Sequence, residues 1–285
     1  MNTLNRVVKW AKIKRREIEK TVKAIPQFGL FSPIIQIRIR LLLIYGLVYP
    51  IIRILSKKQA EILCGYLTKT PTGSRPCSFM PITKNGVIIE RSSDWGSVIE
   101  IYINDTYHLD TIKKGMVILD IGAHIGAYTL LASERGAKTV ISIEPEPSNY
   151  RQLLKNIQVN NLHNIIPINI AVSDYNGEEK LYLNSSSGQH SLVKKTMSFA
   201  QVAVKTIDTL LEELAIQNVD LIKIDAEGAE LAILKGAQKT LQGNPHIKLL
   251  VASEHYPDEP RDIQKFLADL GFKTIISNFD IVETI

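Results

Sequence analysis

Cysteine is scarce in this 285-residue chain, and no apolar stretch is long enough to cross a membrane. The two cysteines, Cys64 and Cys77, cannot form a disulfide framework, which is the usage expected in a reducing compartment. They also do not combine with histidines or carboxylates at the short spacing of a metal motif, so the sequence predicts no required metal. The longest uncharged piece between the arginines near the N-terminus, residues 41–52, falls well short of the roughly 20 residues of a membrane span.

Basic charge is concentrated in residues 1–58. This segment holds 13 lysines and arginines against two glutamates, a net +11, whereas the whole chain is only +5 and the remainder is therefore −6. The first 28 residues are basic and amphipathic and lack the apolar core of a signal peptide. We expect a cytoplasmic protein. Either residues 1–58 contact a membrane surface at its inner face, or they pack as helices on the main domain.

The pattern divides the chain into three parts. Residues 1–58 are expected to be helical, and residues 59–110 a small β-rich lead-in with strands at 86–90 and 97–103. From residue 111 to 285, strand and helix patterns alternate, which is typical of an α/β protein with a mostly parallel sheet and crossover helices.

Within this last part the expected elements can be given by residue range. Strands are expected at 116–121, 139–144, 165–170, 219–225, 247–253, 273–276 and 281–284. Helices are expected at 126–135, 147–160, 206–214, 229–241 and 259–270, with a polar hairpin region at 172–204.

The first of these strands ends in a carboxylate and a glycine turn. Asp120, Gly122 and Gly126 form an Asp-x-Gly-x-x-x-Gly pattern, followed by Tyr128 in the next helix. A dinucleotide site has Gly-x-Gly-x-x-Gly instead. A carboxylate at the strand end would repel a pyrophosphate, but it suits the ammonium of an amino-acid moiety. The turn, with Ala123, therefore predicts S-adenosylmethionine as the ligand rather than NAD.

The next two strand ends complete the predicted cofactor site. Glu144 and Pro145 end the second strand, 24 residues after Asp120, where an acidic residue is placed to bind ribose hydroxyls. Ile170 and Ala171 end the third strand, and small apolar residues there suit the adenine ring. Each of these features taken alone is also compatible with an ordinary strand end.

The fourth strand end carries the candidate chemistry. Asp225 is expected to point toward the reactive end of the cofactor, and Glu227 follows it in the turn into the next helix. Both also suit a helix N-terminus, which favours acidic residues. His124 in the glycine turn and His255 after the fifth strand are further candidates for a proton acceptor. His190 is expected to be a solvated loop residue.

Taken together, these motifs resemble the FkbM family of S-adenosylmethionine-dependent methyltransferases over about residues 85–255. The resemblance implies a class I methyltransferase fold with a seven-stranded, Rossmann-like sheet, and usually O-methylation of a hydroxyl on a sugar or natural product. The family commonly has asparagine where this chain has His124.

The sequence hypothesis is therefore methyl transfer from S-adenosylmethionine to a hydroxyl of a sugar, glycolipid or other small molecule. Asp225, Glu227, His124 and His255 remain open as the proton acceptor. An RNA or protein methyltransferase, or a non-catalytic binding module on the same fold, are the alternatives. The mildly acidic main domain disfavours nucleic acid as a partner. The oligomeric state is not predicted.

Overall fold

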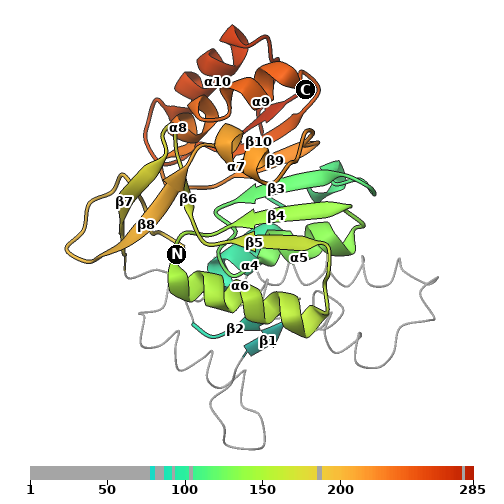
Figure 1. Ribbon diagram of the computed structural model, residues 1–285, viewed down its shortest axis with the longest axis vertical. Helices are drawn as coiled ribbons and strands as arrows, with labels where there is room; N and C mark the ends of the chain where they lie inside the picture. The colour runs from blue at the N-terminus through green and yellow to red at the C-terminus, as the bar shows by residue number, and fades with distance from the viewer. Residues whose placement is uncertain (1–77, 81–86, 92–93, 103–104, 185–187, 278–279) are drawn as a thin grey trace, which may run out of the picture. The chain divides into compact units, whose positions relative to one another are not determined.

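The computed structural model (Figure 1) describes the chain from residue 78 onward, with short gaps. Its contacts divide the chain into Met1–Pro76 and Cys77–Ile285, and every described residue belongs to the second unit. The expectations for residues 1–58, including membrane contact, lie outside the described residues and stay predictions. The described ranges are 78–80, 87–91, 94–102, 105–184, 188–277 and 280–285.

A seven-stranded sheet forms the centre of the fold, in the order β11-β12-β10-β9-β3-β4-β5. The strands β10, β9, β3, β4 and β5 run parallel, and β12 is antiparallel to both of its neighbours. This confirms the predicted mostly parallel α/β sheet. The bounds are β3 Val117–Ile121, β4 Thr139–Ile143, β5 Ile165–Ile168, β9 Leu221–Ile224, β10 Lys248–Ala252, β11 Thr274–Ile276 and β12 Ile281–Thr284.

The strand order reverses between β3 and β9. From β3 the chain continues to β4 and β5 on one side, and it later returns to place β9 on the other side of β3. At such a reversal the loops after the two strands diverge and leave a crevice at their carboxyl ends, which is where open α/β sheets bind ligands.

Helices cover both faces of the sheet and enclose two apolar cores. One core joins α4 (Trp95–Tyr102) and α5 (Ala127–Glu134) to the sheet, and α6 (Pro147–Asn160) packs beside α5 (Figure 1). The other lies under α7 (Ile207–Glu213), α8 (Glu230–Lys235), α9 (Gln238–Gly243) and α10 (Glu259–Asp269). Neighbouring strand residues alternate between them: Ile118 packs in the first core and Leu119 in the second.

The lead-in to the sheet differs from the prediction. The strand expected at 86–90 is present as β2 (Val87–Ile89), which pairs antiparallel with β1 (Ser78–Met80). The strand expected at 97–103 is wrong, because this stretch forms α4. Val98 and Ile101, three residues apart, are both buried in the core, and this burial on one helix face overrides the strand preference of β-branched residues.

The single helix expected at 229–241 is also wrong: the chain forms α8 and α9 with a break at Gly236. The carbonyl of Gly236 accepts a hydrogen bond from the backbone of Asp208 instead of continuing one helix. The Asp208 carboxylate then accepts the backbone N–H of Thr240 in the first turn of α9. A side chain at Gly236 would lie 2.1 Å from the carbonyl oxygen of Ser173, so only glycine fits this contact.

The polar region 172–204 forms the predicted hairpin. β7 (Gly177–Tyr182) and β8 (Phe199–Lys205) pair antiparallel, and β6 (Ala171–Val172) joins β8 in a three-stranded sheet. Within the described part of the chain, no helix has both the length and the apolarity needed to cross a bilayer.

Candidate active site

A cavity of about 270 Å³ opens at the carboxyl ends of β3, β4 and β9. Most of the predicted site residues line it: Gly122, Ala123, His124, Tyr128, Glu144, Pro145, Ile170, Ala171, Asp225 and Glu227. Three predicted residues, Asp120, Gly126 and His255, do not belong to its lining.

The two glycines of the turn are required by packing. Gly122 has a φ of +73°, and a Cβ there would lie 1.8 Å from the carbonyl oxygen of Asp225. The glycine therefore lets the turn after β3 press against the end of β9. At Gly126, φ is +91° and a Cβ would meet the side chain of Leu153 at 2.5 Å. Gly126 thus begins α5 at a close contact with α6, which differs from the cofactor contact expected for it.

Asp120 lies beneath the cavity and is completely buried. Its Oδ2 accepts a hydrogen bond of 2.6 Å from the hydroxyl of Thr129, and its Oδ1 lies 3.2 Å from Nζ of Lys223. The expected direct contact between Asp120 and the cofactor ammonium does not fit this geometry, because the carboxylate faces Lys223 and Thr129.

Lys223 is the buried partner of Asp120. Burial alone would lower the pKa of Lys223, but Asp120 and Asp225 raise it above the usual value, so the ammonium stays charged. Nζ donates a 2.9 Å hydrogen bond to the carbonyl of Gly122 and lies 3.3 Å from that of Ile121. The ion pair therefore holds the backbone of the turn.

His124 links the turn to α4. Its φ of 53° is left-handed, a conformation that asparagine and histidine both tolerate better than most residues. Its Nδ1 lies 3.0 Å from the hydroxyl of Ser97, and its Nε2 lies 3.5 Å from Oδ1 of Asp94. Because both ring nitrogens face these two groups, the geometry does not favour His124 as the proton acceptor.

Glu144 is held by a set of hydrogen bonds at the end of β4. Its Oε2 accepts a hydrogen bond from the backbone N–H of His124 at 2.8 Å. Its Oε1 accepts one from the backbone N–H of Glu146 at 2.9 Å and one from the side-chain amide of Asn149 at 3.3 Å. Burial raises the pKa of Glu144. A carboxylate has about four acceptor positions, so roughly one remains on Oε2 for a further donor.

The apolar part of the cavity combines predicted and unpredicted residues. Ile170 and Ala171 are buried there, as expected, and Leu181 of β7 and Leu192 of the following loop complete the wall. His190 also lines the cavity, and burial lowers its pKa, so the ring is neutral. The expectation of a solvated loop residue is wrong for His190, because its side chain is half-buried against the cavity.

Asp225 lines the cavity beside two buried tyrosines. The hydroxyl of Tyr107 donates a 2.8 Å hydrogen bond to Oδ2 of Asp225. Burial raises the pKa of Tyr107, so the phenol stays protonated and remains a donor. Its ring packs edge-on against Tyr128, with centroids 6.0 Å apart. The Tyr128 hydroxyl is buried and has no hydrogen-bond partner among the described residues.

One end of the cavity is strongly acidic. Four carboxyl groups, those of Glu100, Asp225, Glu227 and Glu254, line it. Burial, together with the charge of Asp225, raises the pKa of Glu100 and of Glu254 to about 7 in each case. Lys223 is the only lysine or arginine in the described lining, and Asp120 already neutralises it.

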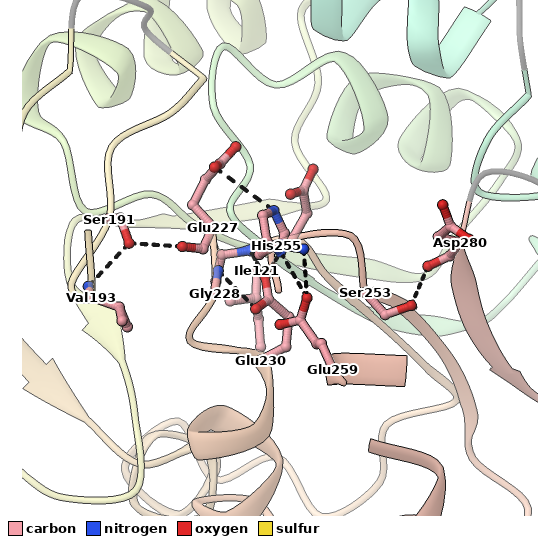
Figure 2. A network of polar contacts seen from close by, with 12 residues as sticks. Ile121, Ser191, Val193, Glu227, Gly228, Glu230, Ser253, His255, Glu259 and Asp280 are labelled. Atoms are coloured by element: carbon pink, nitrogen blue, oxygen red, sulfur yellow. Dashed lines mark hydrogen bonds and ion pairs between the residues drawn. The ribbon is translucent and has the colours of Figure 1, made fainter. Parts of the chain in front are cut away.

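His255 lies behind this acidic end, among three carboxylates (Figure 2). Its Nδ1 lies 3.3 Å from Glu230 and 3.4 Å from Glu259, and its Nε2 lies 3.8 Å from Glu227. Burial lowers the pKa of His255, but the carboxylates of Glu230 and Glu259, together with Asp225, raise it to about 11 overall. A histidine that is protonated at neutral pH cannot accept the proton of a hydroxyl, so the geometry does not support His255 as the base.

The seven-stranded sheet with its reversed strand order, and the cavity at its carboxyl ends, fit a class I methyltransferase, the class whose cofactor is S-adenosylmethionine. More particularly, residues 120–274 match the family model described as "Methyltransferase FkbM domain", and the chain belongs to this family.

Several proteins similar to this chain are named as methyltransferases. Over 176 residues the chain is 25% identical to the hexuronic acid methyltransferase AglP of Haloferax volcanii, a match that covers 60% of this chain and 70% of the relative. It is 26% identical to methyltransferase 1 of Beauveria bassiana over 48% of this chain and 64% of that protein. An FkbM methyltransferase structure from Methylobacillus flagellatus is similar at 15% identity and a TM-score of 0.45. The match covers 66% of this chain and about half (53%) of that one.

Proposed function

We propose that this methyltransferase transfers a methyl group to a hydroxyl oxygen of a sugar, a glycolipid or another small natural product. The observation that carries the proposal is the end of the cavity beside β9, where Asp225 and Glu227 present carboxylates next to the predicted cofactor site. A hydroxyl must lose its proton to attack the methyl group, and a carboxylate within reach can accept it. The similarity to a hexuronic acid methyltransferase supports a sugar as the acceptor.

The lining residues suggest how the cofactor lies. The remaining acceptor position of Glu144 suits a ribose hydroxyl, and the wall of Ile170, Ala171 and Leu192 suits the adenine. The methionine end then extends past Tyr128 toward Asp225. The unpartnered phenol of Tyr128 is a donor available to the cofactor at this end.

The reaction itself needs little from the protein besides alignment. As the acceptor oxygen forms its bond to the methyl carbon, the bond from that carbon to sulfur breaks and its electron pair stays on sulfur. S-adenosylhomocysteine leaves, and the hydroxyl proton passes to Asp225 or Glu227. Holding acceptor, methyl and sulfur in line supplies much of the acceleration.

An RNA acceptor fits less well. A nucleic acid brings a phosphate for every nucleotide, whereas the acidic end of the cavity offers four carboxyl groups and no free lysine or arginine in its described lining. The acidic end therefore disfavours phosphates close to the reacting atom.

The experiment is methyl transfer from radiolabelled S-adenosylmethionine to fractionated glycan, lipid and small-molecule extracts, with the product identified by mass spectrometry. The proposal expects label on an ether oxygen of a sugar or another hydroxylated small molecule. Label on nitrogen, on protein or on RNA, with none on a hydroxylated small molecule, would overturn it.

A further inference from the structure

Behind the acidic end of the cavity, four ionisable side chains converge from two segments, the connections that follow β9 and β10. Asp225 follows β9, Glu230 begins α8, His255 follows β10, and Glu259 begins α10. One ligand atom each from Asp225, Glu230 and His255 lies within 4.8 Å of the other two. Figure 2 shows the Glu230 and Glu259 carboxylates pointing at the His255 ring.

The turn between β9 and α8 is built around the Glu230 carboxylate. Oε1 accepts the backbone N–H of Ala226 at 2.7 Å, and Oε2 accepts that of Gly228 at 2.9 Å. Glu227 and Gly228 both have positive φ angles, 56° and 103°, which lets the turn close tightly over the side chain. The fully buried Glu230 carboxylate is therefore fixed in place before any ligand binds.

Two buried polar atoms in this group lack a hydrogen bond. Nδ1 of His255 faces the carboxylates of Glu230 and Glu259 at 3.3 and 3.4 Å, but makes no hydrogen bond of acceptable geometry. Oε1 of Glu259 is also without a hydrogen-bond partner among the described residues, although this side chain is completely buried. Buried polar groups in proteins are usually hydrogen-bonded, whereas Nδ1 of His255 is held by ion pairs alone and is available to a ligand.

The charge of the group indicates the sign of that ligand. Carboxylates surround the imidazole, while the nearby lysines already have other partners: Lys223 pairs with Asp120, and Lys194 pairs with Glu227 from the outside. Carboxylate oxygens and an imidazole nitrogen together are a ligand set for divalent first-row metals, with manganese and zinc the closest fits.

We propose that Asp225, Glu230 and His255 bind a divalent metal ion of the Mn²⁺ type, with Glu259 supporting His255 from behind. The sequence predicted no metal because the ligands come from separate segments, five and 25 residues apart, and form no short motif. The site becomes visible only when β9 and β10 lie side by side in the sheet.

The position of Asp225 links this ion to the reaction, and this part rests on the proposed function. Asp225 lines the cavity, so an ion that it coordinated would lie at the cavity wall, near the proposed position of the acceptor. Such an ion would make a nearby acceptor hydroxyl more acidic, and Glu227 would accept its proton. The acceptor oxygen would then bond to the methyl carbon as the bond from that carbon to sulfur breaks.

The test uses the full chain after treatment with a chelator and titration with MnCl₂ alone, followed by calorimetry and Mn²⁺ paramagnetic resonance. The proposal expects one ion per chain. His255→Gln and Asp225→Asn should each weaken Mn²⁺ binding at least tenfold. Because Asp225 is partly exposed, the second variant serves if the first does not fold.

His108→Gln is the matched control, since His108 also faces a carboxylate, that of Glu283, away from the cavity. It should bind Mn²⁺ as the unaltered chain does. Absence of stoichiometric binding by the folded chain, or equal affinity in His255→Gln, Asp225→Asn and His108→Gln, overturns the metal site. Metal binding without methylation of any hydroxylated acceptor would instead contradict the proposed function and leave the metal site standing.

Discussion

Lys223 and Asp120, on neighbouring strands, form an ion pair of 3.2 Å that is shielded from solvent and lies directly under the glycine turn. Two sequence motifs at different strand ends thus form one structural unit. The carboxylate fixes the ammonium, and the ammonium holds the carbonyl of Gly122.

Removing one partner of this pair is expected to destabilise the protein strongly. Lys223→Met leaves the Asp120 charge buried without its partner, which typically costs about 3–5 kcal/mol. Urea unfolding followed by circular dichroism measures the loss. The double variant Asp120→Leu, Lys223→Met removes both charges and should recover part of it. If Lys223→Met alone costs less than about 1 kcal/mol, the pair is not the support we describe.

Gly122→Ala tests whether the turn depends on its contact with β9. The new Cβ would lie 1.8 Å from the carbonyl of Asp225, so the backbone must move, at a cost we expect to exceed about 3 kcal/mol. Gly115→Ala is the matched control: its φ of +88° is equally left-handed, but nothing lies within 4 Å of a Cβ there. It should lose only about 1–2 kcal/mol. Equal losses in the two variants would show that left-handed strain alone matters.

The pKa of Glu100 makes stability depend on pH. Folding raises this pKa from 4.5 to about 7, chiefly by burial, so the folded state holds the proton more tightly than the unfolded state does. The contribution of the protonated group to stability is complete below pH 4.5 and is lost as the pH rises through 7. Glu100→Gln should therefore be more stable than the unaltered chain at pH 8, by up to about 3 kcal/mol. At pH 5 the difference should be small. Chemical denaturation at both pH values measures the difference in unfolding free energy between the two proteins. A difference that does not change with pH would contradict the raised pKa of Glu100.

Tyr107→Phe removes the donor to Asp225 without changing the packing of the ring. If this hydrogen bond holds Asp225 in position for the reaction, its loss is expected to weaken transition-state stabilisation by about 1 kcal/mol. This corresponds to roughly a fivefold drop in kcat/KM, to be measured once an acceptor is known. Tyr150→Phe removes a comparable hydroxyl contact, to the carbonyl of Pro167, outside the cavity lining. It should leave kcat/KM unchanged. A similar decrease in both variants would mean that Tyr107 acts only through stability.

The parts of the fold that the sequence predicted depend on local patterns. Apolar runs of strand length alternated with helical periodicity, and this is sufficient for a parallel sheet and its carboxyl-end cavity. The prediction of a strand at residues 97–103 was wrong because a short amphipathic helix rich in β-branched residues resembles a strand in sequence. Only the contacts of Val98 and Ile101 with the core distinguish the two.

The site was predictable where a residue type has a fixed place in the fold, as with Glu144 at the end of β4. It was not predictable where long-range contacts decide the role. Nothing in the local sequence shows that Lys223 forms an ion pair with Asp120, or that Tyr107 donates a hydrogen bond to Asp225. Nor does it show that three carboxylates keep His255 protonated. The first two pairings depend on strand order, which brings residues more than 100 positions apart into contact, and the third depends on β9 and β10 lying side by side.

The most direct test of the account is calorimetric binding of S-adenosylmethionine to the unaltered chain, to Glu144→Gln and to Glu178→Gln, an exposed glutamate on β7. If the cavity holds the cofactor with its ribose at Glu144, the chain binds one equivalent. Glu144→Gln should then weaken binding at least tenfold while Glu178→Gln leaves it unchanged. No binding by the folded chain, or equal binding by all three proteins, would contradict the placement of the cofactor in this cavity.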